Sequence, residues 1–282
     1  MNSNVRLFKY LHPDRTDVLR SGTIRFSSPK VLNDPFELSP HIAAITRHEK
    51  IPADVARLLP DLLAETYAEA SPEIRAVLPF DLYRAYMTAQ SPFMTAVLQL
   101  AMQRFTPDLC RILSQKFEEL IGILCLTESP ANLLMWAHYA DSHRGFVVEF
   151  DSGSRFFDQR VGPDDDLRHL RKVIYQEERP SIVLTEMDDF SPYLTKAKDW
   201  SYETEWRMML PLPTASRIIG EGPTGIHLFE FPKAMIKGLI LGCRMAPEKK
   251  AEIREILAGM TEYQNVYCTE ARIDDRQYRI IV

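Results

Sequence analysis

The sequence IGILCLTESPANLLMWAHYADSHRGFVVEF, residues 121–150, predicts a strand, a helix and a second strand in quick succession. Residues 121–126 form a short apolar run, which is typical of a buried strand. We expect a helix over residues 132–140, and Gly145 opens another apolar run that we expect to be a strand up to residue 150. Strands and a short helix therefore alternate in this part of the chain.

Strand patterns lie on both sides of this stretch, whereas the helical pattern is concentrated in one segment. From about residue 42 to residue 120, apolar residues recur at helical spacing, and prolines divide the segment into several helices. Segregated helices with strands on either side predict an α+β fold with a mixed, largely antiparallel sheet and a helical insertion over about 42–120. We treat residues 1–282 as a single α+β domain that carries this insertion or subdomain. Further strands are expected at residues 5–11, 23–27, 173–175, 202–210, 226–231 and 236–241, and further helices at 14–20 and 247–260.

The composition is that of a soluble globular protein. Hydrophobic residues make up 45% and charged residues 26% of the chain, which excludes disorder as its main state. The net charge of -5 argues against a protein that coats duplex nucleic acid, because such proteins are basic. No apolar run approaches the ~20 residues needed to cross a membrane, and the N-terminal sequence lacks the apolar core of a signal peptide. We therefore expect a cytoplasmic protein without a membrane partner.

The segment KAKDWSYETEWRM, residues 196–208, holds the most informative polar pattern. If residues 202–210 form a strand, Glu203, Glu205 and Arg207 share one face, and the two carboxylates lie about 7 Å apart. One bound sugar or phosphate-linked group can reach both of them. The competing interpretation is a solvated face on which Arg207 pairs with Glu205, an interaction that adds little to stability.

A second polar cluster, RFSSP at residues 25–29, leads into NDPFE at residues 33–37. Its serines and Asn33 are candidate ligand-binding residues. The acidic residues also have a structural explanation, because Asp34 can cap a helix whose third residue, Glu37, returns the bond in a capping box.

A third cluster places Trp136, His138 and Tyr139 within four residues of the helix predicted above. Such a group can bind a planar ligand. The alternative is a helix whose aromatic side chains belong to the core. His138 and His143 are five residues apart rather than four, and no HExxH motif is present, so we expect no metal site here.

The order of these clusters resembles that of a bacterial family known only as domain of unknown function 2971. The resemblance rests on LFKYL, IRFSSPKVLNDPFE, ILCLTE, NLLMWAHYADSHRGFVVEFD, VIY, KDWSYETEWRM and IKGLILG, which are spread over most of the chain. One departure is Leu32, where the family more often has Phe. The resemblance implies a grouping but no reaction.

A more remote resemblance is to ADP-ribosyltransferases of the toxin type, which carry three marks in chain order. These are a basic or His residue on a first strand, a Ser/Thr-rich second strand and a Glu-x-Glu near the end. Arg6 or Lys9-Tyr10, then Phe26-Ser27-Ser28, then Glu203-Thr204-Glu205 occupy that order.

This second resemblance implies an enzyme that cleaves the nicotinamide–ribose bond of NAD and transfers ADP-ribose to a macromolecular acceptor. Glu205 would stabilise the positive charge that develops on the ribose, and Glu203 would activate or orient the acceptor. We expect a bacterial toxin or phage-defence setting, with a partner protein of that system as a further expectation. The residues expected to bind NAD are Tyr10, Ser27, Ser28, Asn33, Trp136, His138, Tyr139 and Arg207.

Two other classes of function remain open from the residues alone. In a metal-dependent nuclease or phosphohydrolase, Asp34, Glu37, Glu203 and Glu205 would converge on Mg²⁺, with Lys196 or Lys198 near the phosphate. We favour no metal, because the capping box already explains two of these acids. In a non-enzymatic sensor or partner-binding module, the cluster of residues 136–139 would hold the ligand or partner.

Overall fold

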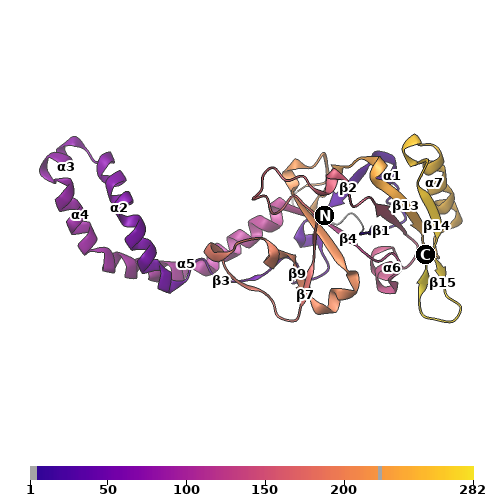
Figure 1. The fold of residues 1–282 in the computed structure, drawn as a ribbon, viewed down its shortest axis with the longest axis horizontal. Helices are drawn as coiled ribbons and strands as arrows, with labels where there is room; N and C mark the ends of the chain where they lie inside the picture. The colour runs from indigo at the N-terminus through magenta and orange to yellow at the C-terminus, as the bar shows by residue number, and fades with distance from the viewer. Residues whose placement is uncertain (1–4, 222–223) are drawn as a thin grey trace. The chain divides into compact units, whose positions relative to one another are not determined.

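The computed structural model describes residues 5–221 and 224–282 (Figure 1). The chain divides into two compact units. Unit 1 is assembled from Met1–Pro40, Lys116–Pro180 and Asp189–Val282, and unit 2 from His41–Gln115 and Ser181–Asp188. No helix among the described residues is long and apolar enough to cross a membrane.

A seven-stranded sheet is the framework of unit 1. Its strand order is β14-β13-β5-β1-β4-β10-β6, and all neighbours are antiparallel except β13 and β14. The predicted α+β class with a mixed, largely antiparallel sheet is confirmed. The strands are β1 Leu7–Leu11, β4 Ile121–Thr127, β5 Phe146–Phe150, β6 Arg171–Lys172, β10 Glu205–Pro211, β13 Ile236–Leu241 and β14 Tyr267–Glu270.

Both faces of this sheet are covered, which explains why its central strands are continuous apolar runs. On one face, α1 (Asp17–Ser21) and α7 (Pro247–Ala258) contribute to the larger core, together with β2 (Thr23–Phe26) and β12 (Ile226–Glu230). On the other face, α6 (Leu133–Tyr139) packs through Met135 and Trp136 against Phe8, Tyr10 and Val147. The remaining strands of unit 1 are β7 Ile174–Gln176, β9 Thr195–Ala197, β11 Arg217–Ile219, β15 Arg272–Ile273 and β16 Ile280–Ile281.

The sheet opens between β1 and β4. β1 is paired with β5 along its whole length, but it is paired with β4 only where Phe8 faces Thr127. Beyond this pair the ammonium group of Lys9 donates a hydrogen bond to the carbonyl oxygen of Cys125 at 3.0 Å, in place of backbone pairing. This opening is where the candidate site lies.

Unit 2 is mainly helical. Its helices are α2 Ile51–Glu69, α3 Pro72–Val77, α4 Phe80–Ala89 and most of α5 Ser91–Leu120. They lie within the segment predicted to be helical, although that segment begins with a strand, β3 (His41–Ala44), which pairs with β8 (Ser181–Val183). Proline at the first helical turns of α2 and α3 accounts for where these helices begin.

Two local predictions are wrong. The strand predicted from residue 202 begins only at Glu205, because residues 198–203 form a 3-10 helix and Thr204 takes a left-handed conformation with φ of 42°. The capping box at Asp34 is also wrong. Residues 35–38 form a turn in which Asp34 accepts a hydrogen bond from the backbone N–H of Phe36. The Glu37 carboxylate pairs with Lys196 instead of with the backbone of Asp34.

The junction of α6 and β5 depends on Gly145. A Cβ atom at this position would lie 2.0 Å from the carbonyl oxygen of Leu11 and 3.0 Å from the Cα atom of Ala140, and neither backbone can give way easily. We expect Gly145→Ala to lower the free energy of unfolding in urea by about 1–3 kcal/mol, the usual cost of overpacking. Gly153→Ala is the matched control, because its Cβ atom would make only an ordinary contact of 3.4 Å with Asp151. Equal effects of the two substitutions would contradict this explanation.

Candidate active site

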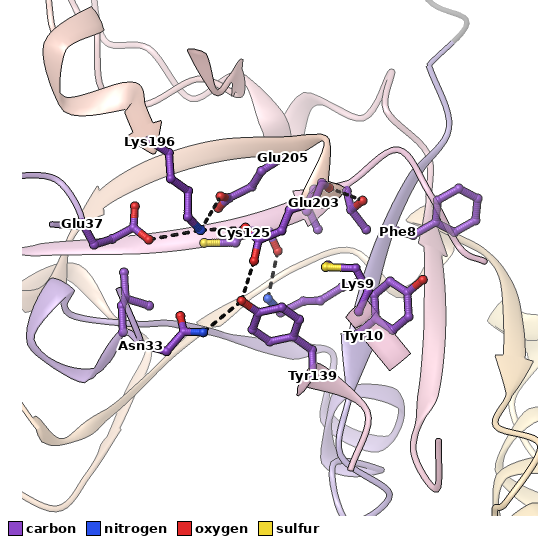
Figure 2. A pocket seen from close by; sticks show the side chains of 14 residues that line it. Phe8, Lys9, Tyr10, Asn33, Glu37, Cys125, Tyr139, Lys196, Glu203 and Glu205 are labelled. Carbon is purple, nitrogen blue, oxygen red and sulfur yellow. Dashed lines mark hydrogen bonds and ion pairs between the residues drawn. The ribbon is translucent and has the colours of Figure 1, made fainter. Parts of the chain in front are cut away.

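A small pocket with a cavity volume of about 90 Å³ lies at the opening between β1 and β4 (Figure 2). All of its lining residues belong to unit 1. This volume is below the ~300–1,000 Å³ of typical ligand pockets, so the pocket admits only a small part of a ligand. The lining residues are Phe8, Lys9, Tyr10, Leu32, Asn33, Glu37, Cys125, Leu126, Thr127, Met135, Tyr139, Lys196, Glu203 and Glu205.

Three carboxylates converge on one buried ammonium group in this pocket (Figure 2). The Nζ atom of Lys196 lies 2.6 Å from Glu203, 3.2 Å from Glu37 and 3.3 Å from Glu205. It also lies 4.7 Å from the centre of the Trp200 ring, close enough for a cation–π contact. Although burial alone would lower the pKa of Lys196, the three carboxylates raise it, so the lysine remains charged.

A second buried cation, Arg207, forms an ion pair with Glu205. Its Nε and Nη2 atoms donate two parallel hydrogen bonds of 2.8 Å to the Glu205 carboxylate, and Nη2 also lies 2.5 Å from Glu37. Both side chains are almost fully buried. Burial alone would raise the pKa of Glu205, but the Arg207 guanidinium lowers it to about 2, so this carboxylate is ionised at neutral pH.

Glu203 has the opposite electrostatic environment. Burial raises its pKa and repulsion from Glu205 raises it further, against the attraction of Lys196. The Tyr139 hydroxyl donates a hydrogen bond of 2.5 Å to Glu203 and accepts one of 3.2 Å from the Asn33 amide. Burial and the carboxylate together raise the pKa of Tyr139, so the hydroxyl keeps its proton. The pKa values of Glu203 and Glu205 are thus shifted in opposite directions, and Glu203 holds a proton more readily than Glu205 does.

The backbone between the two acids explains how both reach the pocket. Glu203 ends the 3-10 helix, Thr204 reverses the backbone in its left-handed conformation, and Glu205 begins β10. A non-glycine residue in this conformation costs about 1–2 kcal/mol, and such strain is commonly found at functional sites. The hydroxyl of Thr127 holds the turn by donating a hydrogen bond of 2.5 Å to the Glu203 carbonyl oxygen.

The pocket brings together half of the residues predicted from the sequence. Glu203 and Glu205 lie at its floor, and Tyr10, Asn33 and Tyr139 line it. The Tyr10 hydroxyl, however, donates to the carbonyl oxygen of Ser129.

Ser27 and Ser28 do not line this pocket. Ser27 pairs with Ile123, which faces Met209 in the neighbouring strand, four residues along β10 from Glu205. Ser28 is buried, donates to the carbonyl oxygen of Glu118 and caps a short 3-10 helix. The two serines, expected from the sequence to bind the same ligand as Glu205, therefore do not share its pocket, because Ser27 meets β4 near the opposite end of that strand.

Three other predicted ligand-binding residues also lie outside the pocket lining. Trp136 is fully buried, and its Nε1 atom donates to the carbonyl oxygen of Pro130, so it is a core residue. His138 points to solvent on the exposed side of α6. Arg207 is fully buried outside the lining, and it donates hydrogen bonds to the lining residue Glu205. Of the three predicted residues of α6, Trp136 therefore points into the core, His138 points to solvent, and only Tyr139 lines the pocket.

The sequence did not indicate that Lys196 would be the centre of the cluster. Lys196 and Lys198 alternate in a short segment, and only the fold shows that the first is buried while the second is exposed and pairs with Glu177. Cys125, Thr127 and Phe8 also line the pocket without any sequence signal beyond the strand pattern.

The described residues contain no group of three or more acidic, His or Cys side chains arranged to hold a metal ion. Glu37, Glu203 and Glu205 do converge, but the ammonium group of Lys196 occupies the position between them. Asp34, the fourth acid of the metal hypothesis, does not line the pocket.

Comparison with known proteins adds a partial family match. A family model described as a protein of unknown function (DUF2971) matches residues 135–208, less than half of the chain. The matched residues begin in α6 and end in β10, so they include Tyr139, Lys196, Glu203 and Glu205. No curated protein and no solved structure matches the chain. The family description names no reaction.

Removal of Arg207 should strongly destabilise unit 1. Arg207→Met leaves Glu37 and Glu205 buried without one of their two cations, so we expect a loss of about 3–5 kcal/mol in the free energy of urea unfolding. Adding Glu205→Leu to this variant should recover part of the loss, because a buried ion pair can be replaced by apolar groups. Arg217→Met, at an exposed position of β11, is the control and should have little effect. A small effect of Arg207→Met would contradict the ion cluster.

The raised pKa of Glu203 predicts the pH dependence of stability. The folded protein holds this proton more tightly than the unfolded chain does. Its contribution to stability is therefore complete below the ordinary value of 4.5 and is lost as pH rises through the folded-state pKa. The stability of the wild type relative to Glu203→Gln should fall as pH rises from about 4 to 8 in urea unfolding.

Glu149→Gln is a control with the opposite sign. Hydrogen bonds from Arg6 outweigh burial and lower the pKa of Glu149, so its contribution is present above 4.5 and is lost on acidification. The stability of the wild type relative to Glu149→Gln should therefore rise with pH. Parallel slopes for the two variants would show that the pKa of Glu203 is not raised.

Proposed function

We propose that the chain is an ADP-ribosyltransferase-like enzyme that cleaves the nicotinamide–ribose bond of NAD and transfers ADP-ribose to a macromolecular acceptor. The observation that carries this proposal is the pair Glu203 and Glu205, two carboxyl groups in one pocket whose pKa values are shifted in opposite directions. Environments that push two neighbouring pKa values apart are typical of enzymes that divide acid–base and electrostatic roles between two carboxyl groups.

Glu205 is the residue suited to stabilising positive charge. Cleavage of an N-glycosidic bond passes through an oxocarbenium-like state at the ribose C1′ atom, and a fixed carboxylate lowers its energy. Glu205 is ionised and held rigidly by two cations, so it requires little reorganisation as the charge develops. Its oxygens and those of Glu203 lie within about 6 Å of each other, because both contact the same ammonium group.

Glu203 is the residue suited to proton transfer. In the proposed reaction the bond between C1′ and the nicotinamide nitrogen breaks, and its electron pair leaves with the neutral nicotinamide. The acceptor then forms a bond to C1′, and its proton passes to the Glu203 carboxylate. A carboxyl group with a raised pKa is a better base for this step than one held ionised.

The remaining lining residues suit a planar ring joined to a sugar. Phe8, Tyr10 and Tyr139 supply aromatic surface, and the Asn33 amide supplies both a donor and an acceptor at the wall. Lys9 is a further amino group at the opening; burial lowers its pKa, and it donates a hydrogen bond to the carbonyl oxygen of Cys125.

Other features favour this proposal over the two alternatives. For a metal-dependent nuclease, Lys196 would have to leave the position between the carboxylates before a divalent ion could enter. For a sensor built on residues 136–139, the Trp136 ring would have to leave the core.

Release of nicotinamide from NAD⁺ tests the proposal, with and without cell lysate as the source of acceptor. Glu205→Gln should lower the rate on the order of 10²-fold or more, as loss of a preorganised electrostatic contact does. Glu203→Gln should reduce transfer to the acceptor more than hydrolysis of NAD⁺. It is the more decisive variant, because it leaves Arg207 paired with Glu205 and the fold intact.

Glu149→Gln is the matched control, since Glu149 is also a buried carboxylate held by an arginine but does not line the pocket. It should keep the wild-type rate. Wild-type protein that neither binds NAD⁺ at millimolar concentration nor releases nicotinamide would contradict the proposal.

A further inference from the structure

We propose that two copies of this chain associate through α5, antiparallel and related by a two-fold axis near residue 103. The proposal concerns unit 2 alone and does not depend on the proposed reaction. It rests on a row of apolar side chains, here called the α5 stripe, that consists of Met94, Leu98, Met102, Phe105, Leu109 and Ile112.

The α5 helix lacks the burial that normally stabilises a helix. It is 30 residues long and has no buried residue, although its apolar residues recur at the spacing of one helix face. It also contains Pro107 in its interior, where a proline costs about 3 kcal/mol. Most helix stability in proteins comes from packing of an apolar face, so a permanent partner is expected to cover this one.

The exposed apolar surface of this face is large enough for a stable dimer. Seven large side chains, five from α5 and two from the neighbouring helix α2, are between 40% and 55% exposed. At on the order of 200 Å² per residue, they offer roughly 700 Å², close to the ~800 Å² that each partner typically contributes to a stable interface. They are Leu58, Leu62, Leu98, Phe105, Leu109, Ile112 and Leu113.

The two halves of the α5 stripe differ in shape. The first half, with Met94, Leu98 and Met102, forms one wall of an apolar groove whose other wall is α2. The groove has a volume of about 410 Å³. The second half, with Phe105, Leu109 and Ile112, forms a shallow apolar patch without a facing helix. The groove is therefore walled by two helices, and the shallow patch by α5 alone.

The spacing of the stripe identifies the occupant as a second copy. Counted along the helix from either end of the stripe, the apolar residues fall at the same distances from that end to within one residue. An antiparallel copy therefore places Leu98 opposite Leu109. The same pairing sets Met94 against Ile112 and Met102 against Phe105. In this pairing the second half of each copy lies against the groove of the other, which is the reciprocal arrangement of a two-fold interface.

Charge does not oppose this arrangement. The stripe itself contains no charged residue. The acidic residues at its margins are already paired within one copy, Asp54 with Arg57 at 2.8 Å and Asp108 with Arg111 at 3.1 Å. A second copy therefore meets a nearly neutral rim.

Sedimentation velocity of the full chain tests the proposal. The wild type should sediment as a dimer at micromolar concentration. Leu98→Lys and Leu109→Glu, made separately, should each shift the protein to monomer, because each buries an unpaired charge in the interface. The double variant should recover the dimer, since the antiparallel pairing places each lysine opposite a glutamate of the other copy.

Leu100→Glu is the matched control. Leu100 lies on the same helix and is 67% exposed, but it is on the side away from the stripe. This variant should remain dimeric. A monomeric wild type would overturn the proposal and would point to another protein or another part of the chain as the cover. A dimer that the double variant fails to restore would overturn the antiparallel pairing.

Discussion

The compensation of three carboxylates by two buried cations is the interaction on which the candidate site depends. Glu37 lies in the turn of residues 35–38, whereas Glu203 and Glu205 flank Thr204 in one continuous segment, and without Lys196 and Arg207 the mutual repulsion of the three carboxylates would drive them apart or force them to take up protons. The two cations balance two charges, and the burial of the third carboxyl group raises its pKa. The negative charge that the two cations do not balance falls on Glu203, which contacts Lys196 but not Arg207 among the ion pairs of the described residues.

This cluster lies where the main sheet is least continuous. The single backbone pairing between β1 and β4 leaves polar backbone atoms that must find other partners, and the Lys9 ammonium group serves one of them. The same opening exposes the first residue of β10 to a ligand while Arg207, two residues further along, remains covered. A carboxylate that lines the pocket and its buried counterion can therefore occupy the same face of one strand.

The two units differ in how completely they bury their apolar residues. The sheet of unit 1 buries both of its faces against helices and neighbouring strands. The helices of unit 2 bury little more than Ile51, Leu59 and Leu63, and α5 buries none of its side chains. The first unit can hold a rigid polar site because its core is complete, whereas the second presents apolar surface that suits association.

Patterns in the sequence predicted the α+β class, five of the seven strands of the main sheet and the helical segment, and they drew attention to Glu203 and Glu205 as candidate site residues. These features follow from local periodicity and residue type, which read the same in any context. Tertiary structure alone decided that Lys196 joins the two acids, that Ser27 and Ser28 lie elsewhere, and that Trp136 is in the core. Each of these depends on which strand is the neighbour and how far the pairing extends. Such contacts join residues distant in the chain, so no local pattern encodes them.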